Sequence, residues 1–276
     1  MSLMRRGVIG ADGARYAGLA RGLGYDVSGG MSITGGGGEL YPWEIDPGSG
    51  PVGGRRAYVA SCASTQEEAG LMEDDGGVVA AGRQDGGRGR SGGRWVSPRG
   101  GIYISVVLRP GSGFEAGLLP AAASLAVRAA ARAAGTAAGL RWPNDVTVGG
   151  RKAAGVMVDA EAGPGGVERA VVGIGINTDA TAAAAEGELG GSAGFYGAAP
   201  LCGAGQRPAV ARALLAELGR LYVLLGSGGA GRVAGMWEAA SGIIGRRTII
   251  RGAEGIAERL EWDGALVVDG RRIYAG

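Results

Sequence analysis

Histidine is absent from this chain of 276 residues. Imidazole is the base of Ser-His-Asp and Cys-His catalytic sites, and it is a frequent ligand of catalytic zinc. The absence of histidine therefore excludes these mechanisms. Any chemistry in this chain has to rely on charged groups, on the positioning of substrates or on Mg²⁺.

Lysine is nearly absent as well, because Lys152 is the only lysine among 28 basic residues and the others are all arginine. An ammonium group is a compact charge with three rotatable donors, and the flat guanidinium group of arginine cannot reproduce it. In a chain that otherwise uses arginine, we interpret Lys152 as a residue that a functional site requires. The alternative is that Lys152 is only a surviving surface charge.

Cysteine and long apolar runs are also scarce. Cys62 and Cys202 are too few for a disulfide framework, and we expect both to be buried thiols. No apolar run approaches the ~18 residues of a membrane span, and the N-terminus shows no signal-peptide core. We therefore expect a cytoplasmic protein without a membrane segment, with an organelle matrix as the alternative location. The net charge of +2 favours neither a nucleic-acid binder nor a membrane-surface protein.

Apolar residues make up 46% of the chain, which is sufficient for a sizeable core. Their spacing predicts a series of strands at residues 56–60, 78–81, 101–108, 151–158 and 167–177. It predicts helices from the hydroxyl cap at Ser64 to Gly76, and at residues 116–134, 207–226 and 233–239. Residues 179–205 are rich in alanine and glycine, and we expect them to form a loop.

Three regions of the chain differ in composition. Residues 1–56 contain glycine clusters that oppose regular structure, and we expect a weakly structured extension, with a small βα unit as the alternative. Residues 57–241 contain the predicted helices and longer strands of one main domain. In residues 242–276, short strands separated by Asp-Gly turns predict a small β-barrel module.

A loop rich in glycine and arginine, residues 85–94, precedes the predicted strand at 101–108. Glycine lets backbone N–H groups approach an anion closely, and guanidinium groups match phosphates and carboxylates. Arg-Gly runs also occur in disordered tails that bind nucleic acids, but such a tail would not lead directly into a buried strand. We interpret the loop as a mobile clamp for an anion at the mouth of a pocket.

Three further patches follow in order along the chain. Residues 141–145 read Arg-Trp-Pro-Asn-Asp, in which the proline forbids a regular helix and Asn-Asp favours a turn. Residues 151–155 read Arg-Lys-Ala-Ala-Gly and follow a Gly-Gly hairpin turn. Residues 173–177 read Gly-Ile-Gly-Ile-Asn, and glycine inside a strand often marks the close approach of a ligand or of another backbone.

Together with residues 87–90 (Gly-Arg-Gly-Arg), Trp95 and residues 97–98 (Ser-Pro), these patches resemble the biotin protein ligases, the biotin–acetyl-CoA-carboxylase ligases. The resemblance covers residues 57–276. It implies an α+β fold, in which a class II synthetase-like mixed sheet with flanking helices forms a biotin- and ATP-binding catalytic domain. It also implies that the C-terminal module is an SH3-like β-barrel.

The resemblance further implies an ATP-dependent ligase that activates biotin as biotinyl-5′-AMP and transfers it to a lysine of a biotin carboxyl carrier protein. ATP and biotin would be the substrates, and Mg²⁺ would assist the nucleotide chemistry. A homodimer is an option. The DNA-binding domain of the family is not recognisable in residues 1–56, so we expect no DNA partner.

The resemblance also assigns roles to individual residues. Lys152, Arg88 and Arg90 would be catalytic, with Lys152 bridging the biotin carboxylate and the α-phosphate. The residues around biotin would be Ser64, Thr65, Gln84, Gly87, Trp95, Tyr103, Ser105, Lys152, Gly155, Gly173 and Gly175. The residues around the nucleotide would be Arg88, Arg90, Trp95, Asn144, Asp145, Lys152 and Asn177, with Asp145 as the Mg²⁺ ligand.

Some of these residues have simpler interpretations. Trp95 could belong to the core, Asn144 and Asp145 could form an ordinary turn, and the Ser64–Thr65 pair could be only a helix cap. The glycines at 173 and 175 could serve packing alone.

The patches also depart from the family pattern in two places. Gly93 stands where the loop of the family has a third arginine, and Arg94 follows it directly. Arg141 replaces the more frequent lysine before Trp-Pro-Asn-Asp. The change at Gly93 leaves open a catalytically inactive biotin-binding module. A second alternative is a lipoate or octanoate transferase of the same architecture, although that enzyme lacks the Gly-Arg loop and the Trp-Pro-Asn-Asp patch.

Overall fold

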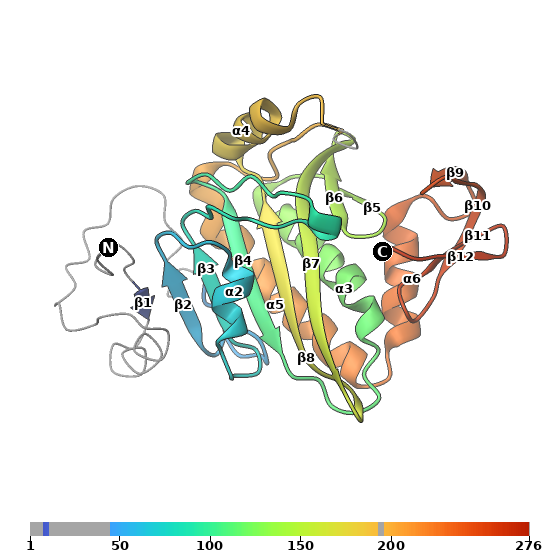
Figure 1. Ribbon diagram of the computed structural model, residues 1–276, viewed down its shortest axis with the longest axis horizontal. Coiled ribbons are helices and arrows are strands. Elements are labelled where there is room, and N and C mark those ends of the chain that lie inside the picture. The colour runs from blue at the N-terminus through green and yellow to red at the C-terminus, as the bar shows by residue number, and fades with distance from the viewer. Residues whose placement is uncertain (1–7, 11–44, 193–195, 276) are drawn as a thin grey trace.

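The computed structural model describes residues 8–10, 45–192 and 196–275, which form two sheets and the helices around them (Figure 1). The larger sheet has eight strands in the order β1-β2-β3-β4-β8-β7-β6-β5. Its strands β2 and β3 are parallel and all other neighbours are antiparallel, so the sheet is mixed. The expected α+β architecture, with a mixed sheet flanked by helices, is confirmed.

The strands of the larger sheet vary in length, and the longest two form a hairpin. Their bounds are β1 Val8–Gly10, β2 Arg56–Val59, β3 Val78–Ala81, β4 Ile102–Leu108, β5 Gly139–Arg141, β6 Asp145–Val148, β7 Arg151–Gly163 and β8 Gly166–Ile176. The predicted strand at 151–158 is therefore longer than the apolar pattern indicates, since β7 continues past it with exposed residues.

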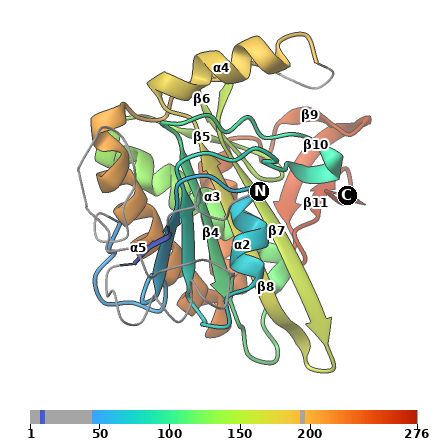
Figure 2. The same cartoon turned by 60° about the vertical axis from the view of Figure 1, so that its left-hand side comes forward.

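Helices cover both faces of this sheet. Their bounds are α2 Thr65–Gly70, α3 Leu119–Ala130, α4 Asp179–Leu189, α5 Arg207–Gly226 and α6 Ala230–Ser241. Short 3₁₀ turns lie at Arg90–Gly92, Ala116–Leu118, Ala131–Ala134 and Ala204–Gln206. Helix α2 lies on one face of the sheet, and α3 and α5 lie on the other (Figures 1 and 2).

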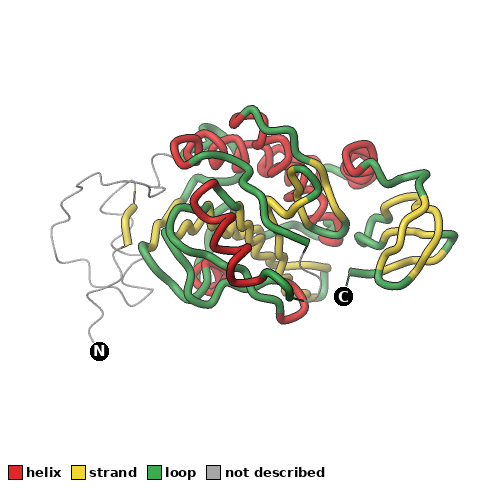
Figure 3. The backbone as a smooth tube through the Cα atoms, turned by 90° about the horizontal axis from the view of Figure 1, so that it is seen from above, coloured by secondary structure: helices red, strands yellow, loops and turns green. Residues whose placement is uncertain are grey.

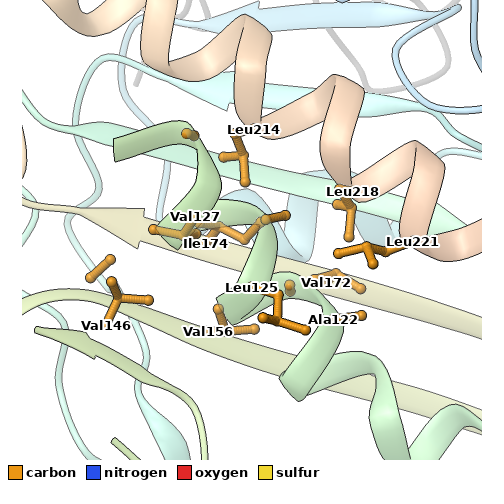
Figure 4. Packing of buried hydrophobic residues seen from close by; sticks show 14 of the residues in the cluster. Ala122, Leu125, Val127, Val146, Val156, Val172, Ile174, Leu214, Leu218 and Leu221 are labelled. Atoms are coloured by element: carbon orange, nitrogen blue, oxygen red, sulfur yellow. The ribbon is translucent and has the colours of Figure 1, made fainter. Parts of the chain in front are cut away.

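The main core lies between the sheet and the helices α3 and α5. Helix α5 begins with Pro208 in its first turn, and its buried leucines recur every three or four residues, as an amphipathic helix requires. Leu125 and Val127 of α3 share one hydrophobic cluster with the leucines of α5 and with Ile174 of β8, and Figure 4 shows these side chains. Each fully buried side chain of this size contributes about 1.5–3 kcal/mol to the free energy of folding, so the sheet that carries the site has a well-packed support.

The opposite face of the sheet is covered by α2, which is shorter than predicted. Ser64 caps the helix as expected, but the helix ends at Gly70 and not at Gly76. The guanidinium group of Arg169 on β8 donates to the carbonyl groups of Ala69, Gly70 and Met72. It thereby provides hydrogen-bond donors for the carbonyl groups at the C-terminal end of α2. A helix of six residues is not stable alone, so Arg169 holds α2 against the sheet.

Residues 179–189 form α4, so the prediction that 179–205 is a loop is wrong for this part. Alanine has the highest helix propensity, and the hydroxyl group of Thr181 accepts a hydrogen bond from the backbone N–H of Thr178 at 2.9 Å. The helix buries its apolar face in a small cluster formed by Val96, Ala182, Ala185 and Ala198. Glycines misled the prediction: Gly187 lies within the helix, and Gly190 and Gly191 follow it directly.

The C-terminal strands form a separate four-stranded antiparallel sheet in the order β12-β11-β10-β9. Their bounds are β9 Arg247–Ile250, β10 Ala253–Leu260, β11 Leu266–Val268 and β12 Arg271–Ile273. Seen from above, this sheet lies at one end of the molecule (Figure 3). Its Asp269-Gly270 turn has positive φ at both residues, and Gly264 of the other predicted turn also has positive φ. The predicted short strands are confirmed.

The segment before β2 contributes two side chains to the core. The side chains of Ile45 and Val52 are fully buried in the main hydrophobic cluster, and β1 pairs with β2 at the edge of the sheet. The helix of the alternative βα unit would lie outside the described residues. Both thiols, Cys62 and Cys202, are buried as predicted, and no helix in the described part of the chain is long and apolar enough to cross a membrane.

Candidate active site

Two adjoining cavities lie where the loop before β4 meets the edge of the larger sheet. The first has a volume of about 220 Å³ and the second about 400 Å³. The predicted residues that line the first cavity are Ser64, Thr65, Gln84, Arg88, Arg90, Trp95, Asn144, Asp145, Lys152, Gly155, Gly173 and Gly175. The residues that line both cavities, and so separate them, are Gly93, Arg94, Trp95, Asp145 and Lys152.

The N-terminus of α2 forms one wall of the first cavity. The hydroxyl oxygen of Ser64 accepts a hydrogen bond from the backbone N–H of Gln66 at 3.2 Å, so Ser64 is both a helix cap and part of the cavity. The amide oxygen of Gln84 accepts hydrogen bonds from the backbone N–H of Thr65 at 2.7 Å and from its hydroxyl group at 3.1 Å. These bonds orient several polar groups toward one small volume.

Glycines on β7 and β8 make room for the larger side chains of the site. A Cβ atom at Gly175 would lie 2.3 Å from Nε1 of Trp95, and one at Gly155 would lie 3.1 Å from Cζ3 of the same indole. At Gly173, a Cβ atom would lie 2.6 Å from the amide oxygen of Gln66. The sequence predicted that a ligand or another backbone would lie close to the strand glycines. In the structure, the side chains of Trp95 and Gln66, which line the cavities, lie close to them.

The arginine loop folds over the cavities as a small hairpin. Its backbone closes through a bridge between Arg88 and Arg94, and the N–H of Gly89 donates to the carbonyl group of Gly93 at 2.6 Å. A Cβ atom at Gly87 would lie 2.4 Å from the carbonyl oxygen of Trp95, and Gly92 has positive φ, which explains the glycines at these two positions.

Each of the three loop arginines contacts a different element. Arg88 lies 3.4 Å from the carboxylate of Asp159 on β7, and Arg94 lies 3.1 Å from that of Glu188 on α4. Arg90 donates to the side-chain oxygen of Asn144 at 3.3 Å. Arg94, which follows the departure from the family pattern at Gly93, lines both cavities.

Arg90 lies in a position that favours an anion. Burial lowers the pKa of its guanidinium group from the ordinary value, the positive charge of Arg251 adds to this effect, and Asp145 opposes it. A group whose charged form is disfavoured by burial and by a like charge gains free energy when an anion binds beside it. The electrostatics of the loop therefore match a negatively charged ligand.

Lys152 lies at the boundary of the two cavities, with 27% of its side chain exposed. Its Nζ is 2.6 Å from Oδ1 of Asp145 and 5.5 Å from the ring centre of Trp95. A β-bulge on β7 inserts one extra residue between the partners of Val146 and Thr147. Because of this bulge, Lys152 and Gly155 both face the first cavity although they are three residues apart.

The Trp-Pro-Asn-Asp patch joins β5 to β6 and is more than an ordinary turn. The Trp142-Pro143 peptide bond is cis. The side-chain amide of Asn144 donates to the carbonyl group of Val156, and the N–H of Val156 donates to the carbonyl group of Asn144 at 3.1 Å. These bonds hold Asn144 and Asp145 against β7, beside Lys152.

Four predicted residues lie outside the lining of the first cavity. Ser105 lies behind its wall, where its hydroxyl group is 2.8 Å from that of Thr65, and Tyr103 is buried with its hydroxyl group bound to the carbonyl group of Pro98. Gly87 is covered by the backbone of the loop. Asn177 lines the second cavity and donates to the carbonyl group of Lys152 at 3.2 Å.

The sequence analysis missed several residues of the site. Gln66 lines the first cavity, and its amide nitrogen lies 3.2 Å from Asp159. Tyr196 lines the second cavity and donates to Oδ2 of Asp145 at 2.8 Å. Gln66 directly follows the predicted pair 64–65, so its position was a usable signal, whereas Tyr196 lies in a glycine-rich segment without a recognisable pattern.

Asp145 is the only carboxylate among the described residues that line either cavity. In the same part of the chain, no three histidine, cysteine or acidic side chains gather as a metal cluster would require. Mg²⁺ in nucleotide sites needs only one or two protein carboxylates, because phosphates and water supply the other ligands. The residues present therefore fit a magnesium ion that arrives with a nucleotide.

Comparison with known proteins gives one family. Residues 63–177 match the model of the "Biotin/lipoate A/B protein ligase family". The chain is 43% identical over 103 residues to the biotin–[acetyl-CoA-carboxylase] ligase of Paracoccus denitrificans. The aligned residues make up 36% of this chain and 43% of that relative. The chain is 32% identical over 135 residues to the bifunctional ligase/repressor BirA of Bacillus subtilis, covering 46% of this chain and 42% of that protein. The matches thus span less than half of these relatives.

Solved structures with the same fold cover more of the chain. The biotin protein ligase from Aquifex aeolicus in complex with biotin and ATP has a TM-score of 0.55 at 22% identity, over 81% of this chain and 97% of that one. The Leishmania major biotin protein ligase in complex with biotinyl-5-AMP has a TM-score of 0.53 at 19% identity, over 80% and 99%. The sequence of residues 63–177 is thus similar to the biotin/lipoate ligase family, and the fold of the chain is similar to that of solved biotin protein ligases.

Proposed function

We propose that this protein is a biotin protein ligase, which activates biotin with ATP and transfers it to a lysine of a carrier protein. The observation that carries the proposal is the position of Lys152, the only lysine of the chain, between two adjoining cavities. One cavity is small and polar at its α2 wall, and the other is larger. A cation between two sites is suited to draw together two anions, the carboxylate of biotin and the α-phosphate of ATP.

The first step uses groups that do not need histidine. An oxygen of the biotin carboxylate, which is ionised at neutral pH, attacks the α-phosphorus of ATP. A bond forms between that oxygen and phosphorus, the bond from phosphorus to the bridging oxygen breaks, and pyrophosphate leaves. Arg88, Arg90 and Lys152 would stabilise the charge on the transferring group.

In the second step, the amine of a carrier lysine attacks the carbonyl carbon of biotinyl-5′-AMP. An amide bond forms, the bond to the phosphate oxygen breaks, and AMP leaves. The reactive anhydride has to be shielded from water between the two steps. The arginine loop, which lies over the first cavity, is the element placed to do this.

The two ligands would be divided between the two cavities. The ureido ring of biotin would lie in the first, beside Ser64, Thr65 and Gln84, where hydroxyl and amide groups converge. The nucleotide would lie in the second, which Asn177 lines, with Trp95 between the two sites. A magnesium ion would be held by Asp145 together with the phosphates, and it would neutralise charge on them.

One experiment separates this proposal from its alternatives. Pyrophosphate release is measured with ATP and either biotin or lipoate, and the acyl-adenylate is identified by mass spectrometry. Release with biotin alone supports the ligase. Release with lipoate alone would indicate the lipoate branch of the family, and biotin binding without release would indicate an inactive binding module.

We also propose a division of the chain and a setting for it. Residues 57–241 would form the catalytic domain after an N-terminal segment at 1–56, and residues 242–276, which include the four-stranded sheet, would form an SH3-like module.

Because the reaction consumes ATP and needs a carrier protein with a biotin-accepting lysine, we place the protein in the cytoplasm. Size-exclusion chromatography of the chain with and without biotin and ATP determines whether it forms a homodimer.

The arginine loop is expected to become protected when both substrates bind. Without ligands, trypsin should cleave after Arg88 and Arg90, because both lie in a loop at the surface and the ion pair of Arg88 with β7 is exposed. Biotin with ATP should slow these cleavages, and Arg90→Ala should release biotinyl-AMP into solution while still forming it. Equal cleavage with and without substrates would contradict the clamp.

The protein is expected to lack sequence-specific DNA binding, although one matched relative is named a ligase/repressor. The sequence of residues 1–56 contains glycine clusters and no pattern typical of a basic helix, and the net charge of the chain is only +2. A gel-shift assay with random double-stranded DNA over a range of salt concentrations tests this expectation. A complex that resists salt and prefers one sequence would overturn it.

A further inference from the structure

The segment that carries Tyr196 is fastened to the backbone of Lys152. The N–H of Lys152 donates to the carbonyl group of Gly197, and the N–H of Ala199 donates to the carbonyl group of Lys152, both at 2.9 Å. The segment therefore pairs with β7 at the position of the lysine, as a short added strand. Any group on this segment has a set position relative to Lys152.

Helix α4 anchors the same segment from outside. The carboxylate of Glu186 accepts a hydrogen bond from the N–H of Ala198 at 2.8 Å and lies 3.0 Å from the guanidinium group of Arg151. These contacts lower the pKa of Glu186, the bond from Ala198 most strongly. The segment thus has fixed contacts on both sides, although it follows a glycine-rich stretch.

Tyr196 reaches from this segment to the carboxylate that pairs with Lys152. Its hydroxyl group donates to Oδ2 of Asp145 at 2.8 Å, while Oδ1 of Asp145 lies 2.6 Å from Nζ of Lys152. The guanidinium group of Arg141 lies over the Tyr196 ring, 4.0 Å from its centre. Arg141 and Asp145 are partners across β5 and β6, so the tyrosine contacts both strands of that pair.

The two oxygens of Asp145 therefore have separate partners. The χ2 torsion of aspartate is broad and roughly two-fold, so a lysine alone does not select one orientation of the carboxylate. A hydroxyl donor on the other oxygen does select one. The hydroxyl group of Tyr196 is this donor, 2.8 Å from Oδ2 of Asp145.

We propose that Tyr196 is a positioning residue, which orients Asp145 so that its second oxygen holds the ammonium group of Lys152 at the boundary between the two cavities. The effect on the reaction rests on the proposed function, because the ammonium group matters there for joining biotin to ATP. The effect on Lys152 itself does not rest on that function.

The single lysine of the chain allows a test without activity. Protein labelled with [ε-¹³C]lysine gives one lysine resonance, which reports the surroundings of Lys152 alone. The variants are Tyr196→Phe, which keeps the ring and removes the hydroxyl group, and Tyr222→Phe as a matched control. Tyr222 also places its hydroxyl group near an aspartate, 3.3 Å and 3.4 Å from the two oxygens of Asp75, and it lines neither cavity.

We expect the lysine resonance to move in Tyr196→Phe and to stay in place in Tyr222→Phe. At saturating biotin and ATP, adenylate formation by Tyr196→Phe should slow about tenfold, as expected for loss of a hydrogen bond to a charged group. The KM for biotin should stay within about twofold, because the α2 wall of the first cavity is untouched.

An unchanged lysine resonance in Tyr196→Phe would overturn the inference, whether or not the parent chain forms adenylate. A shifted resonance with an unchanged rate would overturn the role of Tyr196 in the reaction. A parent chain that forms no adenylate would reject the proposed function alone, since the resonance still decides whether Tyr196 controls the position of Lys152.

Discussion

Replacing Lys152 by arginine is expected to slow single-turnover formation of biotinyl-AMP by a factor on the order of 10²–10³, roughly 3–4 kcal/mol, similar to loss of an oxyanion donor. Charge alone would predict almost no effect, particularly in a chain that uses arginine everywhere else. The ammonium group lies 2.6 Å from Asp145 in the wall that separates the two cavities. A guanidinium group is longer and flat, and it cannot place one donor between two oxygens of different molecules.

The matched control is the reverse exchange at the neighbouring position, Arg151→Lys. Arg151 is exposed, pairs with Glu186 and lines neither cavity, so this change should leave the rate within about threefold, less than one kcal/mol. Lys152→Ala should be at least as slow as Lys152→Arg. An arginine variant that reacts within threefold of the parent would show that Lys152 does not act through its geometry.

Replacing Gly175 by alanine is expected to weaken the binding of both biotin and ATP, each by about 10- to 100-fold. The new Cβ atom would lie 2.3 Å and 2.4 Å from Nε1 and Cε2 of Trp95, so the indole would have to move. Trp95 lines both cavities, and its displacement changes the shape of each. The expected loss of about 1.4–2.7 kcal/mol lies within the cost of overpacking.

Two further glycine variants sharpen this test by isothermal titration calorimetry. Gly173→Ala places its Cβ atom 2.6 Å from the amide oxygen of Gln66, which lines only the first cavity, so it should weaken biotin and leave ATP unchanged. Gly231→Ala in α6 meets nothing within 4 Å and should affect neither ligand. If Gly175→Ala binds both ligands as the parent does, Trp95 does not separate the two sites.

Much of the site could be predicted from the sequence because its residues occur in short, unusual patches. The loop at 85–94, the Trp-Pro-Asn-Asp patch and the only lysine were each recognisable without a structure. Glycine inside the strand at 173–177 indicated that another group lies close to the strand. In the structure these groups are the side chains of Gln66 and Trp95. Local patterns of this kind follow from the chemistry of a few neighbouring residues, and so they are visible in one dimension.

Most of the strands and of the longer helices were predictable for a similar reason. The apolar spacing of α5 reflects burial of one face of the helix, and the nearly continuous apolar run of β4 reflects burial of the strand on both faces of the sheet. The prediction failed for α4, where an alanine-rich helix is followed by glycines and buries only small side chains. The apolar pattern of α4 is weak, so the alanine- and glycine-rich composition of residues 179–205 led to the prediction of a loop.

By itself, the sequence determined which chemistry this protein can carry out: no imidazole, one ammonium group and a loop of arginines between glycines. Only the tertiary structure decided how these groups meet. The bulge on β7 turns Lys152 and Gly155 to one side, and the segment after α4 brings Tyr196 to Asp145 across 51 residues of sequence. Strand register and the docking of distant segments depend on the packing of the whole sheet, which no local pattern records.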